Sequence, residues 1–133
     1  MILYYFKKKE NTDKLVSSKI YKSIVKSTQK ISNKSKFDIK NEFNSYFELM
    51  VILLFLIFFS YKDISKNKKI IQELMNLFIT DIDHTLREEG IGDMSIGKYV
   101  KAYVKKTYYR ISLLDDIILN NDFLKFQNYV KMI

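Results

Sequence analysis

The chain has 133 residues, of which 47% are hydrophobic and 29% are charged, so it is long enough for one domain with a buried core and too apolar to remain disordered. It contains no cysteine, which excludes disulfide bonds, thiolate metal sites and a cysteine nucleophile. The net charge is +8, and the whole excess lies in residues 1–40, where eleven lysines stand against three acidic residues. Such a segment suits anionic lipid, ribosomal RNA or an acidic protein, or is simply a solvated lysine-rich face.

Residues that interrupt helices are almost absent, because the chain has no proline and only three glycines. This composition predicts an all-α fold. We expect a basic tail over residues 1–12 and a single helical domain over residues 13–133. Within that domain the first helix is expected over 13–30, followed by a loop in the Ser/Asn/Lys stretch at 32–36.

An uninterrupted apolar run, Leu49–Phe59, predicts the centre of the fold. As a helix these residues span about 16 Å, against a hydrocarbon core of about 30 Å, and Glu48 and Lys62 close the run on either side. A helix that is apolar on all sides belongs in the middle of a bundle, although membrane insertion or a partner's groove is the alternative. We therefore expect a buried helix near residues 43–61. The apolar N-terminal stretch precedes its lysines, which is not the order of a secretory signal.

The next helix has the clearest pattern, since its apolar residues recur mostly at steps of three and four. Asp83 and Arg87 are i,i+4 neighbours on its polar side. Gly90 is expected to end it in the left-handed conformation, and Asp93 or Ser95 to cap the helix that follows. The apolar stripe consists of Ile70, Ile71, Leu74, Met75, Phe78, Ile79, Ile82 and Leu86.

The last long helix is expected to place lysines outside and apolar residues inside. Lys98, Lys101 and Lys105 lie on one side of it. A short helix over residues 122–132 then ends the chain. These elements predict a compact bundle of about five helices around the apolar helix at 49–59, with a glycine-rich helix–turn–helix corner at 90–97. The expected inner side of the long helix consists of Ile96, Val100, Tyr103, Val104, Tyr108, Ile111, Leu114 and Ile118.

One motif points to an enzyme. The segment around Asp81, Asp83 and Thr85 resembles the first motif of the haloacid dehalogenase superfamily, in which a strand ends in Asp-x-Asp-x-Thr and the aspartates serve a Mg²⁺-dependent phosphatase. Asp115 and Asp116 resemble that superfamily's acidic pair. However, the residues before the motif have helical periodicity, and the chain that follows is too short for the required strands. We regard this phosphatase as the less favoured alternative.

Other catalytic chemistry finds little support in the sequence. His84 is the only histidine, so no histidine cluster exists for zinc. No nucleophile, base and orienting group can be assembled. We expect a non-enzymatic protein with no cofactor and no metal.

The segment from Asp81 to Arg110 resembles the signature of the ubiquinol–cytochrome c chaperone family. Upstream, Tyr46-Phe47-Glu48-Leu49 is similar to that family's entry into an apolar helix, and Ile20–Val25 to its N-terminal stretch. The chain departs from the pattern by lacking a proline turn around 37–44, and by having Tyr46 and Tyr109 in place of arginine and glycine. The matching pieces are Asp81 and Asp83, Leu86-Arg87-Glu88, Gly90-Ile91-Gly92-Asp93, Ile96-Gly97-Lys98 and Tyr108-Tyr109-Arg110.

The resemblance implies a non-catalytic assembly factor for respiratory complex III, the ubiquinol–cytochrome c reductase. Its expected client is nascent or newly inserted cytochrome b, with a small partner protein, the ribosome near its exit tunnel and an anionic membrane surface as further partners, and no DNA. The expected location is cytoplasmic and peripheral at the inner membrane of a bacterium, or the matrix side of a mitochondrion. A ribosome- or membrane-surface adaptor that acts through the basic N-terminal third is the main alternative.

The candidate client- or partner-binding residues all lie in the glycine-rich segment. The three glycines are expected to let the turn form and the backbones approach, and the charged residues to hold the corner or face the client. They are Asp81, Asp83, Arg87, Glu88, Gly90, Gly92, Asp93, Gly97, Lys98 and Arg110.

Overall fold

The computed structural model describes the backbone of residues 2–33 and 43–133, and the side chains of residues 12–33 and 43–133. This part of the chain forms helices and no strand, so the predicted all-α fold is confirmed. A short 3₁₀ turn, η1, precedes the third helix. The elements are α1 (Ile2–Asn33), α2 (Phe43–Tyr61), η1 (Ser65–Asn67), α3 (Lys68–Glu88), α4 (Asp93–Leu119) and α5 (Phe123–Lys131).

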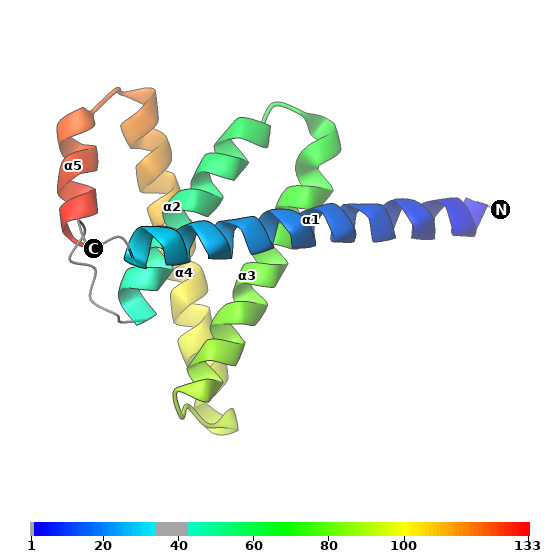
Figure 1. The fold of residues 1–133 in the computed structure, drawn as a ribbon, viewed down its shortest axis with the longest axis horizontal. Coiled ribbons are helices and arrows are strands. Elements are labelled where there is room, and N and C mark those ends of the chain that lie inside the picture. Colours follow the sequence, from blue (N-terminus) through cyan, green and yellow to red (C-terminus); the bar gives the residue numbers. More distant parts are fainter. Residues whose placement is uncertain (1, 34–42) are drawn as a thin grey trace.

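The bounds agree with the predicted elements except at α1. This helix begins at Ile2 instead of near residue 13, because no residue before Asp13 interrupts a helix. The expected loop lies mostly at residues 34–36, outside the described residues. In Figure 1, α1 crosses in front of α2 and α3, α4 lies behind them, and α5 folds back beside the end of α4.

The core lies where α2 meets α3 and α4. Val51, Leu54 and Leu74 are completely buried, and Leu114 of α4 packs in the same cluster. The N-terminal half of the apolar run is thus core, as predicted, but Leu56 near its end is 46% exposed. By length and composition α2 is able to cross a membrane, a test that core helices of soluble proteins also pass, and 44% of its apolar window is buried.

The predicted inner side of α4 is wrong at one residue. Tyr108 is 58% exposed, and the adjacent Thr107 is buried instead, at 1% exposed. Steps of three and four from Ile96 through Tyr103 reach Thr107 and then Leu114, which leaves Tyr108 on the outer side. The Thr107 hydroxyl donates to the Tyr103 carbonyl at 2.8 Å, so the buried threonine is satisfied without breaking the helix.

The corner between α3 and α4 depends on one glycine. Gly90 has φ +101°, and its N–H donates to the Arg87 carbonyl at 3.1 Å, while the N–H of Ile91 donates to the Leu86 carbonyl at 3.1 Å. These two bonds form a Schellman motif, in which the residue after the helix adopts the left-handed conformation. The predicted role of Gly90 is confirmed.

Three other expectations at the corner are wrong. The N-cap of α4 is Gly92, so neither Asp93 nor Ser95 caps it. A Cβ added at Gly92 or Gly97 meets nothing within 4 Å, so neither glycine permits a close backbone approach. Gly97 lies inside α4 and is exposed, where it only weakens the helix.

These observations predict opposite effects for two alanine substitutions. Gly90→Ala should lower the free energy of unfolding by about 1–2 kcal/mol, because an L-residue is strained at this φ. Gly97→Ala should raise it by about 0.5–1 kcal/mol, because the site is open and alanine favours the helix. Urea denaturation followed by circular dichroism measures both, and an equal loss in the two variants would contradict this account of the corner.

Candidate functional site

A buried carboxylate joins three helices at one end of the bundle. Glu48 lies in the first turns of α2, and its side chain is 12% exposed. Its Oε1 accepts from Arg110 Nη2 at 3.2 Å and lies 3.1 Å from Lys106 Nζ, and both partners come from α4. Its Oε2 accepts from the Tyr129 hydroxyl of α5 at 3.0 Å. We call these four residues the Glu48 cluster.

Aromatic rings complete the surroundings of the two cations. The Arg110 guanidinium carbon lies 5.4 Å from the centre of the Tyr129 ring, and Lys106 Nζ lies 5.0 Å from that of Phe47. A carboxylate loses hydration when it is buried, and it is tolerated only with such charged partners and hydrogen bonds. The Glu48 cluster is therefore a cross-link between α2, α4 and α5. Arg110 belongs to it and not to the glycine corner, contrary to expectation.

At the corner itself, Arg87 connects the two helices. Its Nε donates to Asp83 Oδ1 at 2.6 Å, and its Nη1 donates to Asp93 Oδ1 across the turn. The expected i,i+4 pair of Asp83 and Arg87 is formed, but it lies within α3, and the contact across the turn is the bond to Asp93, which was not predicted from the sequence. Glu88 pairs with His84 at 3.1 Å on the exposed side of α3. Lys98 is exposed on α4. Arg87, Glu88 and Lys98 are absent from the lining of the groove between α1, α2 and α3.

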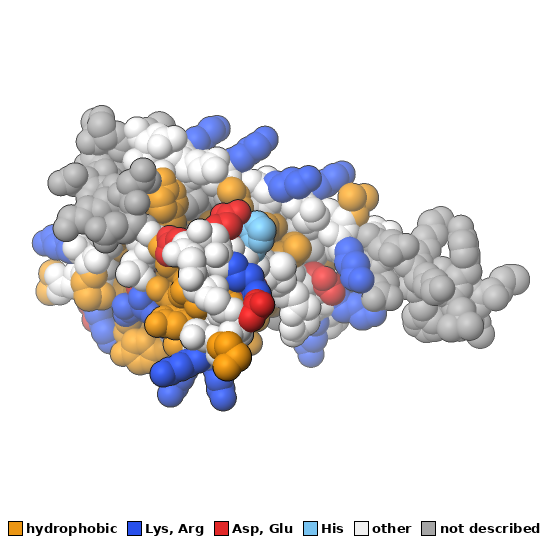
Figure 2. Space-filling view, turned by 90° about the horizontal axis from the view of Figure 1, so that it is seen from below, with side chains coloured by type: hydrophobic (Ala, Val, Ile, Leu, Met, Phe, Trp, Pro, Cys, Tyr) orange, Lys and Arg blue, Asp and Glu red, His pale blue; other side chains and the backbone are white. Residues whose placement is uncertain are grey.

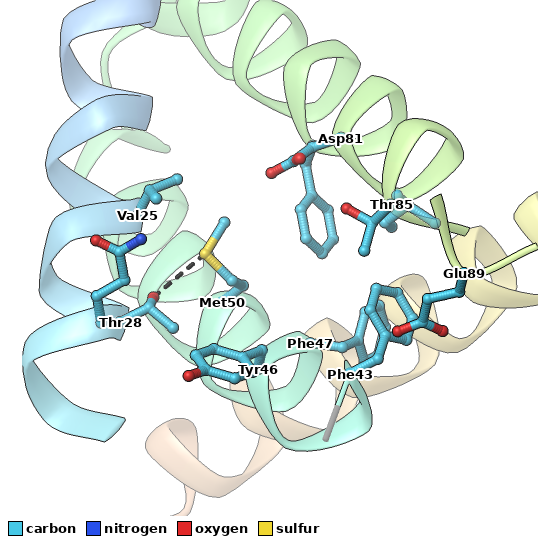
Figure 3. Close-up of a pocket in the computed structure, with 12 residues that line it drawn as sticks. Val25, Thr28, Phe43, Tyr46, Phe47, Met50, Asp81, Thr85 and Glu89 are labelled. Carbon is cyan, nitrogen blue, oxygen red and sulfur yellow. Dashed lines mark hydrogen bonds between the residues drawn. The ribbon is translucent and has the colours of Figure 1, made fainter. Parts of the chain in front are cut away.

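A groove opens between α1, α2 and α3, with a volume of about 420 Å³. Its floor is formed by aromatic and apolar side chains of α2, with Phe78 and Ile82 of α3. Asp81, Thr85 and Glu89 follow one another at four-residue steps along α3 and form one wall, as Figure 3 shows. The lining residues are Val25, Thr28, Gln29, Phe43, Tyr46, Phe47, Met50, Phe78, Asp81, Ile82, Thr85 and Glu89.

The groove differs in charge from the rest of the molecule. Although the chain carries a net charge of +8, the lining residues that the structure describes include two carboxylates and no lysine or arginine. Asp81 Oδ2 accepts from the Tyr21 hydroxyl of α1 at 2.5 Å, which ties α1 to α3 beside the groove. Burial, together with the hydrogen bond to Asp81 and its negative charge, raises the pKa of Tyr21 above its ordinary value of 10.0. The bond from Tyr21 thus fixes the position of the Asp81 side chain beside the groove.

The residues selected from the sequence are spread over separate places in the fold. Of these candidates only Asp81 lines the groove, and the groove's other carboxylate, Glu89, was missed although its four-residue spacing from Thr85 and Asp81 is visible in the sequence. The aromatic floor was missed because Phe43 and Phe47 look like ordinary core positions. Of the aromatic lining residues, Phe43 and Tyr46 are partly exposed whereas Phe47 and Phe78 are buried, and this difference depends on how whole helices cross, which no local pattern encodes.

The phosphatase motif lacks its structural context. Its residues lie within helix α3, and no strand is formed in the ranges 2–33 and 43–133. Asp81 bonds Tyr21, whereas Asp83 bonds Arg87, because residues two apart face different sides of a helix. Asp115 does not join these aspartates, since its Oδ1 lies 4.0 Å from Lys62 Nζ. Among the described residues, no group of three His, Asp or Glu side chains converges as a metal site.

The Glu48 cluster generates a stability prediction. Glu48→Gln should lower the free energy of unfolding by about 3 kcal/mol, because removing one partner leaves the buried charges of Arg110 and Lys106 without compensation. The matched control, Glu88→Gln, alters an exposed carboxylate and should stay within about 0.5 kcal/mol of the unchanged chain. Urea denaturation of both variants is the measurement, and similar midpoints would contradict the cross-link.

A pH dependence follows from Tyr129. Burial and then the nearby charge of Glu48 raise the pKa of Tyr129 above its ordinary value of 10.0. Above that pH the unfolded chain releases this proton while the folded chain keeps it, so the free energy of unfolding falls as the pH rises. The slope from this residue is at most about 1.4 kcal/mol per pH unit. Denaturation between about pH 9 and 11 should show a shallower fall for Tyr129→Phe, and equal slopes would disprove the assignment.

Comparison with known proteins agrees with the resemblance seen in the sequence. The family model described as ubiquinol-cytochrome C chaperone matches residues 35–124, which is more than half of the chain. No individual curated protein and no solved structure shows a significant match. The matched range contains the Glu48–Arg110 pair, the corner at Gly90 and most of the groove's lining. The chain therefore belongs to the ubiquinol-cytochrome C chaperone family.

Proposed function

We propose that this protein is an assembly factor that holds newly made cytochrome b before complex III, the ubiquinol–cytochrome c reductase, is complete. It acts by binding its client and not by catalysis. The observation that supports this proposal is the open apolar groove within a member of a chaperone family. Nine of the twelve lining residues fall in the matched range 35–124.

The groove has the properties of a binding site for an apolar segment. Packed cores ordinarily fill a space of this size, and an open, mostly apolar hollow with a few polar groups is typical of a ligand site. Three helices line it. The hydrogen bond from the Tyr21 hydroxyl to Asp81 connects the walls that α1 and α3 form. The Glu48 cluster fixes α2 from the other side. The partly exposed side chains of the floor, Phe43 and Tyr46, are therefore accessible without unfolding the protein.

The outer surface suits a location near anionic partners. Exposed lysines follow α1, and Lys98, Lys101 and Lys105 lie exposed on α4. Figure 2 shows basic side chains on opposite edges of one face, with most of the acidic side chains between them. We propose that the protein works in the cytoplasm at the inner membrane, or on the matrix side of a mitochondrion, in contact with anionic lipid or the ribosome and together with a small partner protein.

The same lysines favour a second candidate function, an adaptor for a ribosome or membrane surface. In that case binding would weaken steeply with added salt and would not depend on the groove. Apolar contacts between groove and client are much less sensitive to salt. A groove-filling variant therefore separates the two functions.

The test is a deletion of the gene followed by a reduced-minus-oxidised spectrum of the membranes. We expect selective loss of the cytochrome b signal of complex III, restored by the unchanged gene. Thr85→Trp places a large ring in the groove and should restore little of the signal. The matched control, Thr80→Trp, makes the same change on the exposed side of α3 and should restore it fully. An unchanged cytochrome b level after deletion would overturn the proposal.

A further inference from the structure

We propose that the groove selects client segments in which a large apolar side chain lies next to lysine or arginine. This inference rests on the proposed function and specifies the chemistry that the groove recognises. The occupant is a basic end of an apolar segment from a partner protein. Three observations carry it: the acidic wall, the absence of lysine and arginine among the described lining residues, and the aromatic floor.

The acidic wall is directed at the groove. Asp81 and Glu89 lie two helical turns apart on α3, with Thr85 between them, and all three line the groove in Figure 3. Asp81 uses only Oδ2 for its bond to Tyr21. Glu89 is exposed, and in the described part of the chain no hydrogen bond or ion pair holds its carboxylate. Both carboxylates thus have oxygen atoms available for a ligand's cation.

Cations of the protein itself lie near the groove but have other positions. Arg87 is bound to Asp83 and Asp93 on the corner side of α3. Lys22 and Lys26 of α1 line a neighbouring hollow, which shares Val25 and Asp81 with the groove. In a chain with a net charge of +8, the described lining of this groove therefore carries two carboxylates and no cation. Carboxylates in this position attract basic segments and repel acidic ones.

The floor supplies the apolar half of the recognition. The rings of Phe47 and Phe78 stack with centres 5.8 Å apart, and Phe43 meets Tyr103 edge to face at 5.1 Å. These contacts hold the rings of the floor in place before a client arrives. With Met50 beside them, the groove of about 420 Å³ has room for a large apolar side chain.

Membrane proteins supply this combination at the ends of their spans. Short loops on the side of synthesis carry an excess of lysine and arginine close to the apolar segments. A chaperone on that side therefore has access to the junction between a span and its basic loop. The acidic wall then contacts the loop, and the aromatic floor contacts the first apolar residues of the span.

The experiment measures binding of three labelled peptides to the full chain by fluorescence anisotropy. The peptides share one Leu-Phe-Leu core, which is flanked on both sides by two lysines, two glutamines or two glutamates. We expect the lysine peptide to bind most tightly and the glutamate peptide most weakly. The preference should shrink as salt is added, because it is electrostatic.

Two neighbouring carboxylates provide matched variants. Glu89→Gln should raise the dissociation constant of the lysine peptide about two- to fivefold, which is the range for a partly exposed ion pair. The dissociation constant of the glutamine peptide should not change. Glu88→Gln removes an adjacent carboxylate that faces away from the groove and should change nothing. Glu89→Lys should reverse the preference in favour of the glutamate peptide. Circular dichroism of each variant verifies that the fold is kept.

Equal binding of the three peptides, or an equal effect of Glu88→Gln and Glu89→Gln, would overturn this inference while leaving the cytochrome b test unaffected. Conversely, charge selection by the groove together with an unchanged cytochrome b level would overturn the proposed client alone. The chain's own residues 36–40, Lys-Phe-Asp-Ile-Lys, have similar chemistry. If a Gly/Ser replacement of these residues raised binding of all three peptides equally, the occupant would be this segment and the inference would be wrong.

Discussion

The carboxylate of Glu48 is the interaction on which the arrangement of α2, α4 and α5 depends. It accepts from Arg110 and Tyr129, which are 62 and 81 residues away in sequence. α2 is apolar on nearly all sides, so burial alone scarcely distinguishes one rotation of this helix about its axis from another. A buried polar contact makes that distinction, because only one rotation gives the charge its partners. The same rotation turns Phe43, Phe47 and Met50 toward the groove.

Rigid surroundings and an open groove are thus two results of one packing scheme. The Glu48 cluster closes the bundle on the side of α4 and α5, and the Tyr21–Asp81 bond ties α1 to α3. Between these two connections, α1 crosses the bundle at an angle, and Phe43 and Tyr46 of the groove stay partly exposed. A groove held from both sides loses little conformational entropy when a client binds, which favours affinity. Under the proposed function, the two carboxylates of its described lining would add selection by charge.

The sequence predicted helices well because helix formation here follows local rules. The steps of three and four in α3, the absence of proline and the single left-handed glycine, Gly90, all act over a few residues. The same local reasoning failed at Gly92 and Gly97, where the glycines were assigned to close contacts that the structure lacks. It also failed at Tyr108, which was expected on the inner side of α4 but is exposed. The mixed apolar and aromatic residues of this helix did not distinguish whether residue 107 or residue 108 faces the core. The family signature was visible because it consists of short, ordered motifs, but a signature does not state which of its residues meet.

By itself the sequence determined the helical class, the bounds of the helices after α1 within a few residues, the corner at Gly90 and the family, since each depends on residue type and near-neighbour spacing. Only the tertiary structure decided that Arg110 belongs with Glu48, that Asp81 bonds Tyr21, and that Asp81 and Glu89 share a groove with the aromatic floor of α2. These pairings join distant parts of the chain. They depend on the crossing of whole helices, which is settled by the combined packing of the core and not by any single segment.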